Sequence, residues 1–214
     1  MNYKYKLLIA VLLAHGSIAL ACADVTTAQS VQNVLIEKLN KFDGFTANFS
    51  QKIFDADGNL LQDDASGTID VKRPNLFKWH TQLPDENLVV SNGETLWMFD
   101  PFVGEAHIYN IDDAIVNSPM VLLSSNDITL WQQYSVSQRS SDEYVIDALD
   151  ETSQVKQLIV RFTDSVLSSF TIVDSTEQTS TFDLSQVQYA QLPDNSTFTL
   201  TLPEGISVID KRNQ

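Results

Sequence analysis

The fold class of this chain follows from one stretch, Phe45-Thr46-Ala47-Asn48-Phe49-Ser50-Gln51-Lys52-Ile53. Apolar and polar residues alternate along it, which is the period-two pattern of a strand with one buried face. Asp57-Gly58 follows after three further residues, and this dipeptide favours the tight turn of a β-hairpin. The segment therefore predicts a strand that turns back to pair with the next part of the chain.

Short apolar segments separated by turn signals continue to the C-terminus, with no repeat and no interdomain linker. The predicted strands are residues 66–71, 76–81, 87–91, 95–99, 105–109, one near Trp131, 144–146, 155–162, 166–173, 179–184 and 198–202. We expect a mainly β (α+β) protein with one antiparallel sheet of about ten strands. A sheet of that size curls, and helices on its concave side would make it a partly open barrel.

Two segments break the strand pattern. Residues 26–39 carry apolar side chains at helical spacing behind the capping-box pair Thr26 and Gln29, and Gly44 follows where a helix would stop. Residues 112–126 contain a possible cap at Asp112 or Asp113 and a proline at Pro119 that suits a helix start. We expect a first helix at 26–39 and short helices in 112–126.

The segments Leu88–Val90 and Leu96–Phe99 are apolar at every position. An antiparallel sheet with one wet face should alternate, so these strands predict apolar surroundings on both sides. Two explanations stay open. One is a helix over one face and loops over the other, and the second is an apolar cavity lined by one face.

Residues 1–23 have the layout of a secretory signal peptide. Lys4 and Lys6 precede an uncharged apolar run at residues 7–13, and small residues lead to Ala21-Cys22-Ala23. The run is shorter than the roughly 20 residues that cross a bilayer. We expect cleavage after Ala23, export to the bacterial periplasm and a mature chain of residues 24–214 that forms a single domain. The alternative is a buried N-terminal helix.

Cys22 leaves a second possibility open, because a cysteine behind small residues is a candidate lipid-attachment site. The residues before it are Ala19-Leu20-Ala21, whereas lipoprotein signals usually place the large aliphatic residue one position earlier. Cleavage after Ala23 would remove the only cysteine of the chain. The apolar core alone would then hold the fold, without a disulfide.

The composition excludes several classes of partner. Loss of Lys4 and Lys6 with the signal changes the formal net charge from −15 to −17. Such a surface repels nucleic acid and anionic bilayers, and any docking partner is expected to present a basic patch. Beyond the signal, no apolar run is long enough for a transmembrane helix.

Candidate catalytic and metal-binding residues are few. The mature chain has two histidines, His80 and His107, and neither belongs to a His-x-x-x-His or Glu-x-x-His pair that would indicate zinc. Asp55–Asn59 faintly resembles a calcium loop but has Gly58 at the wrong position, so a turn is the better interpretation. We expect no cofactor, no metal and no enzyme activity. The alternative is a periplasmic hydrolase that uses His80 or His107 beside a carboxylate.

The most informative segment is residues 72–80, Lys-Arg-Pro-Asn-Leu-Phe-Lys-Trp-His. Together with motifs elsewhere it resembles the periplasmic outer-membrane lipoprotein carriers, the LolA family. The other matching motifs are Phe49-Ser50-Gln51-Lys52, Gln82, Pro84-Asp85-Glu86, Ser91-x-Gly93-x-Thr95-Leu96-Trp97, Asp100-Pro101-Phe102-Val103, Pro119 and Trp131-Gln132-Gln133-Tyr134. Asp100 stands where the family has Asn. The motifs span residues 45–134, and the remainder agrees in strand pattern, length and Pro203-x-Gly205.

This resemblance implies an unclosed antiparallel β-barrel with a lid of short α-helices over an apolar cavity. The cavity would take the acyl chains of triacylated lipoproteins, and no covalent chemistry is involved. A monomeric carrier would receive its load from an inner-membrane ATP-driven complex and pass it to an outer-membrane receptor. Each buried methylene contributes about 0.8 kcal/mol, so an acylated anchor needs such a shield to cross water.

The resemblance also implies roles for particular residues. Arg73 would be a latch whose guanidinium donates to backbone carbonyls of the lid, formed by residues 112–126 and the N-terminal helix. The candidates for acyl-chain contact are Phe77, Trp79, Val89, Trp97, Phe99, Met120, Leu122 and Leu123. Spacing alone favours the ordinary interpretations, in which Arg73 is an exposed strand-end arginine and Phe77 and Trp79 are core residues.

Two further functions stay open beside the carrier and the enzyme. One is a lipid-anchored outer-membrane receptor of the same fold, for which lipidation of Cys22 would be the discriminating feature. The other is a carrier of free lipid or glycolipid, which the sequence does not distinguish from a lipoprotein carrier.

Overall fold

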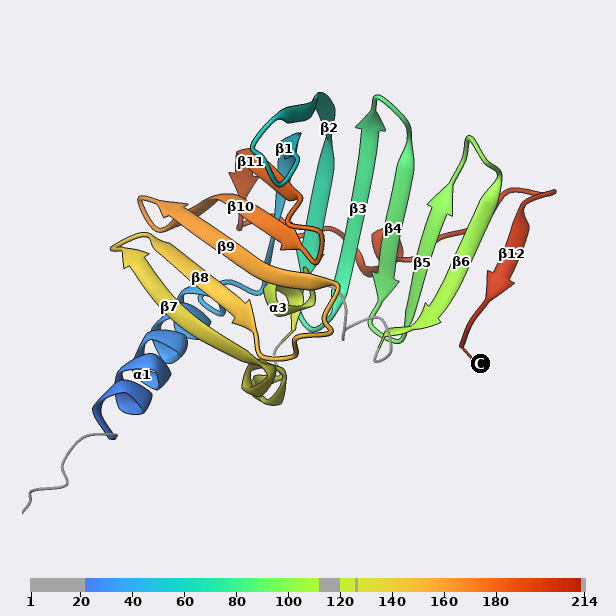
Figure 1. Ribbon diagram of the computed structural model, residues 1–214. Helices are drawn as coiled ribbons and strands as arrows, with labels where there is room; N and C mark the ends of the chain where they lie inside the picture. Colours follow the sequence, from blue (N-terminus) through green and yellow to red (C-terminus); the bar gives the residue numbers. More distant parts are fainter. Residues whose placement is uncertain (1–21, 112–119, 126, 213–214) are drawn as a thin grey trace, which may run out of the picture.

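The computed structural model describes residues 22–111, 120–125 and 127–212 (Figure 1). Residues 1–21 of the predicted signal (1–23), residues 112–119 and 126 of the predicted lid segment (112–126), and the last two residues lie outside these ranges.

One large sheet dominates the described chain. Its twelve strands are β1 (Gly44–Phe54), β2 (Leu60–Lys72), β3 (Leu76–Leu83), β4 (Asn87–Asn92), β5 (Thr95–Asp100), β6 (Glu105–Asn110), β7 (Tyr134–Ser140), β8 (Glu143–Ala148), β9 (Val155–Thr163), β10 (Val166–Asp174), β11 (Thr179–Gln188) and β12 (Ser207–Asp210). They lie in the order β12-β6-β5-β4-β3-β2-β1-β11-β10-β9-β8-β7. All neighbours are antiparallel except β12 and β6, which are parallel.

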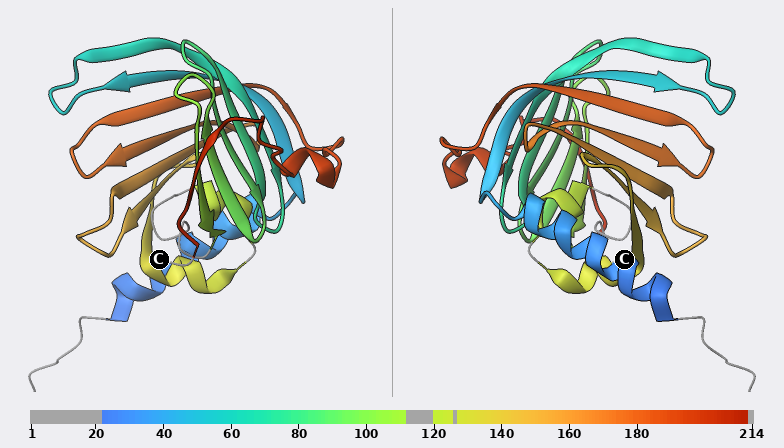
Figure 2. Two further views of the ribbon diagram at one scale, coloured as in Figure 1. Left: turned by 90° about the vertical axis from the view of Figure 1, so that its right-hand side faces the viewer. Right: turned by 90° about the vertical axis from the view of Figure 1, so that its left-hand side faces the viewer.

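The sheet curls strongly but does not close, because β12 and β7 form its two edges. Figure 2 shows it wrapped around the helices, which lie on its concave side. The predicted fold class, a mainly β unclosed antiparallel barrel with helices, is therefore confirmed. The strand count is somewhat higher than the predicted ten, since the short β12 adds an edge strand that the sequence pattern did not reveal.

The alternation seen in residues 45–53 produces the concave core. Phe45 pairs with Val71 and Ala47 pairs with Ile69, and all four side chains are buried. Their polar neighbours in β1 point to the other face. At the end of this strand Asp55 accepts hydrogen bonds from the backbone N–H groups of Asp57 and Asn59, which confirms the predicted hairpin turn.

Three helical segments lie on the concave side. They are α1 (Cys22–Leu39), α3 (Met120–Ser124) and the 3-10 helix η1 (Ile128–Gln133). The predicted helix 26–39 lies within α1, which packs beside β7 and buries Leu35 and Leu39 in the core. The Gln32 side chain donates to the carbonyl of Trp131 at 3.1 Å and so ties α1 to η1. Among the described helices, none combines the length and apolarity needed to cross a membrane.

Two predicted strands were wrong. The strand near Trp131 is η1, which Asp127 caps by accepting from the Thr129 N–H, and β7 begins only at Tyr134. The strand predicted for residues 198–202 is instead the 3-10 helix η2 (Asn195–Phe198), capped by Asp194, followed by chain without helix or strand. In both cases a short polar capping residue sets up a helical turn that the apolar residues alone do not indicate.

The segment after β11 covers part of the convex face. It lies outside the sheet (Figure 2), with η2 against β3 and β4. Phe198 of η2 and Val90, Phe99 and Ala106 of the strands are all buried. This covering explains why β4 and β5 are apolar on both faces, as the interpretation with loops over one face requires.

Candidate functional site

The turn between β2 and β3 joins the sheet to both helical regions. The guanidinium of Arg73 donates through Nη1 to the carbonyl of Phe42 at 2.7 Å and through Nη2 to the carbonyl of Leu123 at 2.8 Å. Phe42 lies between α1 and β1, and Leu123 lies in α3. One side chain therefore connects the sheet to α3 and to the segment that leads out of α1.

Backbone hydrogen bonds reinforce the same turn. The N–H of Arg73 donates to the carbonyl of Asp43 at 2.7 Å, and the N–H of Asn75 donates to that of Ser124 at 2.9 Å. Asn75 has a φ of 59°, a left-handed conformation that Asn tolerates better than most residues. Its carbonyl accepts from the fully buried Ser91 hydroxyl at 2.7 Å, and that hydroxyl accepts from the Gly93 N–H. The turn thus has a fixed shape that aims Arg73 at the helices.

Arg73 lies in a largely desolvated position. Burial lowers the pKa of its guanidinium from the ordinary value, and the nearby Asp43 and Tyr189 partly oppose that effect. Its Nε is buried and has no hydrogen-bond partner within the described residues. The guanidinium thus gains two strong charge-assisted hydrogen bonds. Burying its charge costs free energy in return, and its Nε, which lacks a partner among the described residues, does not offset that cost. The net stabilisation from this contact is therefore smaller than its two hydrogen bonds alone would give.

Aromatic side chains gather on the concave face beside this turn. The Trp79 ring lies 4.7 Å from that of Phe49, 4.8 Å from Phe182 and 5.8 Å from Phe170, measured between centroids. These residues come from β3, β1, β11 and β10, so the cluster spans the strongly curled middle of the sheet. Trp79 remains half-buried while the other three rings are buried.

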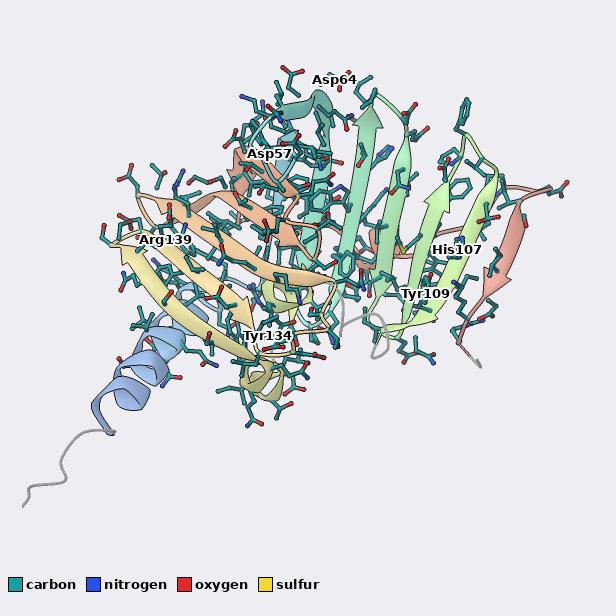
Figure 3. All side chains as sticks on the ribbon, viewed as in Figure 1. Asp57, Asp64, His107, Tyr109, Tyr134 and Arg139 are labelled. Atoms are coloured by element: carbon teal, nitrogen blue, oxygen red, sulfur yellow. The ribbon has the colours of Figure 1, made fainter. Side chains whose placement is uncertain are left out.

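The concave side of β4 and β5 is apolar but less covered, and β6 adds Tyr109 and the His107–Glu105 pair to it. Val89 pairs with Met98, and Met98 pairs with His107, so these three side chains share the concave face. Met98 is 41% exposed, and Val89 and Tyr109 are partly buried. Figure 3 labels His107 and Tyr109 on β6, near the β12 edge of the sheet. Within the described residues, this part of the concave face is more exposed than the aromatic cluster around Trp79.

The structure brings most of the sequence candidates together. Phe77, Trp79 and Val89 lie on the concave face, and Leu122 and Leu123 of α3 belong to the same apolar core. Trp97 and Phe99 lie on the opposite, convex face, where Trp97 pairs with Val90 and Ile108. The side chain of Met120 lies outside the described part of the chain.

Sequence reasoning missed several residues around Arg73. Phe42, Asp43 and Ser124 contribute backbone carbonyls, which leave no trace in the residue types. Tyr189 stacks on Phe42 with ring centroids 4.0 Å apart. A signal did exist for Ser91, because a polar residue in an otherwise apolar strand usually satisfies a buried backbone group.

The two histidines do not form one site. His80 and His107 each place Nε2 beside a glutamate oxygen, Glu86 at 2.8 Å and Glu105 at 2.6 Å. Strand pairing puts His80 on the convex face and His107 on the concave face. Across the described ranges, no group of three or more His, Cys, Asp or Glu side chains is arranged to hold a metal ion.

Comparison with known proteins assigns the chain to a family. The family model for the outer membrane lipoprotein carrier protein LolA matches residues 40–201. Curated relatives named outer-membrane lipoprotein carrier protein include one from Aliivibrio fischeri strain MJ11, which is 36% identical and aligned over 87% of this chain and 93% of its own length. A second from Histophilus somni strain 129Pt is 36% identical with 99% of each chain covered, and one from Klebsiella pneumoniae strain 342 is 38% identical with 83% and 87% covered.

Among solved structures, a LolA superfamily protein from Nitrosomonas europaea aligns with a TM-score of 0.46 and 13% identity over 81% of this chain and 97% of its own. The family assignment stands on the sequence matches, which extend over the strands, the Arg73 turn and the helical segments alike. This chain is a member of the LolA family of outer membrane lipoprotein carrier proteins.

Proposed function

We propose that this protein carries lipid-modified proteins across the periplasm by shielding their acyl chains. The observation that carries the proposal is the Arg73 side chain, which ties the sheet to the helical segments above an apolar concave face. Membership of the lipoprotein carrier family supports it. The matched family is described as a carrier and not as an enzyme.

The mechanism follows from two competing states. In the closed state α1 and α3 cover the concave core, and Arg73 holds them through the carbonyls of Phe42 and Leu123. In the open state acyl chains replace the helical side chains against Phe77, Trp79 and Val89. Burial of the acyl methylenes drives opening, at about 0.8 kcal/mol each, and renewed bonding of Arg73 favours release. The carrier therefore binds its cargo without trapping it.

The proposal includes a location and a route. Residues 1–23 would direct export and be removed after Ala23, leaving residues 24–214 as a monomeric carrier domain in the periplasm. An ATP-driven complex in the inner membrane would load the carrier, and a receptor in the outer membrane would unload it. Both partners would handle the triacylated anchor that the carrier shields.

Release of a lipoprotein from spheroplasts tests the proposal. Spheroplasts that synthesise a labelled lipoprotein are incubated with the purified mature protein, and the medium is separated by size exclusion. We expect a soluble one-to-one complex of lipoprotein and carrier, and none with a cargo whose acylated cysteine is replaced by serine. A folded protein that leaves the lipoprotein in the membrane would contradict the carrier function.

The same preparation separates the carrier from the lipid-anchored receptor. The mass of the mature chain isolated from the periplasm should correspond to a start at Asp24. A chain that begins at an acylated Cys22 and fractionates with membranes would favour the receptor instead.

A further inference from the structure

Two neighbouring hairpin turns expose large apolar side chains. Phe102 and Val103, in the β5–β6 turn, are 89% and 67% exposed, and Leu83, beside the β3–β4 turn, is 57% exposed. The two turns lie at the same end of the sheet, because β4 and β5 pair between them with Leu88 opposite Phe99. We refer to Leu83, Phe102 and Val103 as the apolar tip.

The apolar tip lies at the far end of β3 from the Arg73 turn. β3 begins one residue after Asn75 and ends at Leu83, and Figure 1 shows the β3–β4 and β5–β6 turns at the opposite end of their strands from α3. The tip is therefore separate from the latch and from the closed concave core. Its exposure needs an explanation of its own, since exposed apolar patches in soluble proteins mark contact sites.

The β5–β6 turn is held rigidly in this exposed shape. One carboxylate oxygen of Asp100 accepts from the N–H groups of both Phe102 and Val103 at 2.9 Å. The N–H of Gly104 donates to the carbonyl of Asp100, and Gly104 has a φ of 71°. Its own carbonyl accepts from Ser207 at the start of β12. A turn whose backbone is already fixed loses less conformational entropy when a partner buries it.

The charges around the tip select the kind of partner. Asp85, Glu86, Asp100 and Glu105 flank the two turns, and the sequence has no lysine or arginine between Lys78 and Arg139. The neighbouring segment before β12 adds Glu204. The histidines His80 and His107 each pair with one of these glutamates. An aromatic tip that inserts into an anionic bilayer is normally framed by lysine and arginine, whereas this one would be repelled.

We propose that the apolar tip docks into an apolar pocket of a protein partner whose pocket is rimmed by basic side chains. The inference rests on the proposed function, and it assigns the partner to the membrane-bound proteins that load or unload the carrier. Phe102 acts as the central anchor, and the surrounding carboxylates guide association by long-range attraction.

The test compares Phe102→Ser/Val103→Ser with the matched control Val166→Ser, which alters an exposed valine in the β9–β10 hairpin. Each protein is first loaded with labelled lipoprotein from detergent, a route that needs no partner. Loading from spheroplasts and delivery to native outer-membrane vesicles are then measured. We expect all three proteins to load equally from detergent, and the double variant to lose about tenfold or more in spheroplast loading, in delivery, or in both. Added salt screens the attraction between charges, so it should slow the wild-type protein in whichever of these two steps the double variant loses.

Three results decide between the alternatives. Equal loading and delivery by the double variant and the wild type would overturn the inference. The wild type could also float with vesicles of phosphatidylethanolamine and phosphatidylglycerol and lose this binding when Phe102 is substituted. That result would overturn the inference, because the partner would then be a lipid surface. A wild-type protein that takes no lipoprotein even from detergent would instead count against the proposed function.

Discussion

Substitution of Arg73 by leucine tests the latch directly. The change removes the hydrogen bonds from the guanidinium to the carbonyls of Phe42 and Leu123, at 2.7 and 2.8 Å. It also removes a buried charge whose pKa is already lowered by desolvation, so the leucine side chain suits the site. We expect Arg73→Leu to fold normally, to load lipoprotein and to release it poorly.

The size of the effect follows from the two bonds. A hydrogen bond to a charged group contributes about 1.5–3 kcal/mol net, and opening lets the same groups reach water, which favours the lower figure. Two such bonds contribute about 3 kcal/mol, which corresponds to about a 150-fold change in the ratio of closed to open protein. In the proposed mechanism acyl chains bind the open form, so the apparent affinity for cargo should rise by up to this factor and delivery should slow accordingly.

The assay follows transfer of labelled lipoprotein from the purified carrier complex to outer-membrane vesicles. Arg139→Leu is the matched control, because it deletes the same charge at an exposed position where Arg139 forms a surface ion pair with Glu143 at 3.7 Å. Arg73→Lys should fall between the wild type and Arg73→Leu, since one ammonium group does not reproduce the planar fork. Hydrogen exchange at the Asn75 amide, which donates to Ser124, reports opening of the same contact.

Delivery by folded Arg73→Leu at the wild-type rate would refute this reasoning. So would a slow transfer shared equally by Arg139→Leu, because the loss would then reflect net charge rather than the bridge to the helices. Circular dichroism would show whether Arg73→Leu is folded. If it is unfolded, the delivery rate of Arg73→Lys is compared with that of the wild type instead.

Three other predictions concern the concave face and the core. Met98→Asp places a charge on the concave face and should lower loading from spheroplasts about tenfold. Val208→Asp, on the exposed β12, should leave loading unchanged. Equal loading by the two variants would contradict a lipid-binding role of the concave face. Gly67→Ala should lower the free energy of unfolding by about 2 kcal/mol or more, because its Cβ would lie 2.0 Å from the carbonyl oxygen of His80. An unchanged denaturation midpoint would show that β2 and β3 can move apart at little cost. Burial raises the pKa of Asp70 despite the nearby Lys78, so the folded state holds this proton more tightly and loses stability as the pH rises from the ordinary pKa to the raised one. Asp70→Asn should therefore unfold at a higher denaturant midpoint than the wild type at pH 7, and this difference should vanish below about pH 4. The same difference at every pH would contradict the burial effect.

The sequence predicted those features that depend on local pattern. Alternation along residues 45–53 and the Asp57-Gly58 turn correspond to β1 and its hairpin, and the helical spacing of 26–39 corresponds to part of α1. Prediction failed where a capping residue outweighs the apolar pattern, at Trp131 and Phe198. It also missed β12, a four-residue edge strand that is mostly exposed and pairs in parallel with β6.

The site was predictable only in part, because its decisive contacts are long-range. Arg73 reaches carbonyls 31 and 50 residues away in the chain, and spacing alone does not distinguish it from an exposed arginine. The apolar run of residues 96–99 indicated two covered faces, but its covering segment lies about a hundred residues further on. Trp97 and Phe99 were consequently grouped with the concave residues, although strand pairing puts them on the convex face.

Direct binding of cargo tests whether the concave face shields acyl chains. A triacylated lipoprotein and its unacylated cysteine-to-serine form are each mixed with the purified mature protein in dilute detergent, and the products are weighed by native mass spectrometry. We predict a one-to-one complex with the acylated cargo alone, and about tenfold less of this complex with the Met98→Asp variant. Equal binding of the unacylated form, or no complex with either, would contradict the account.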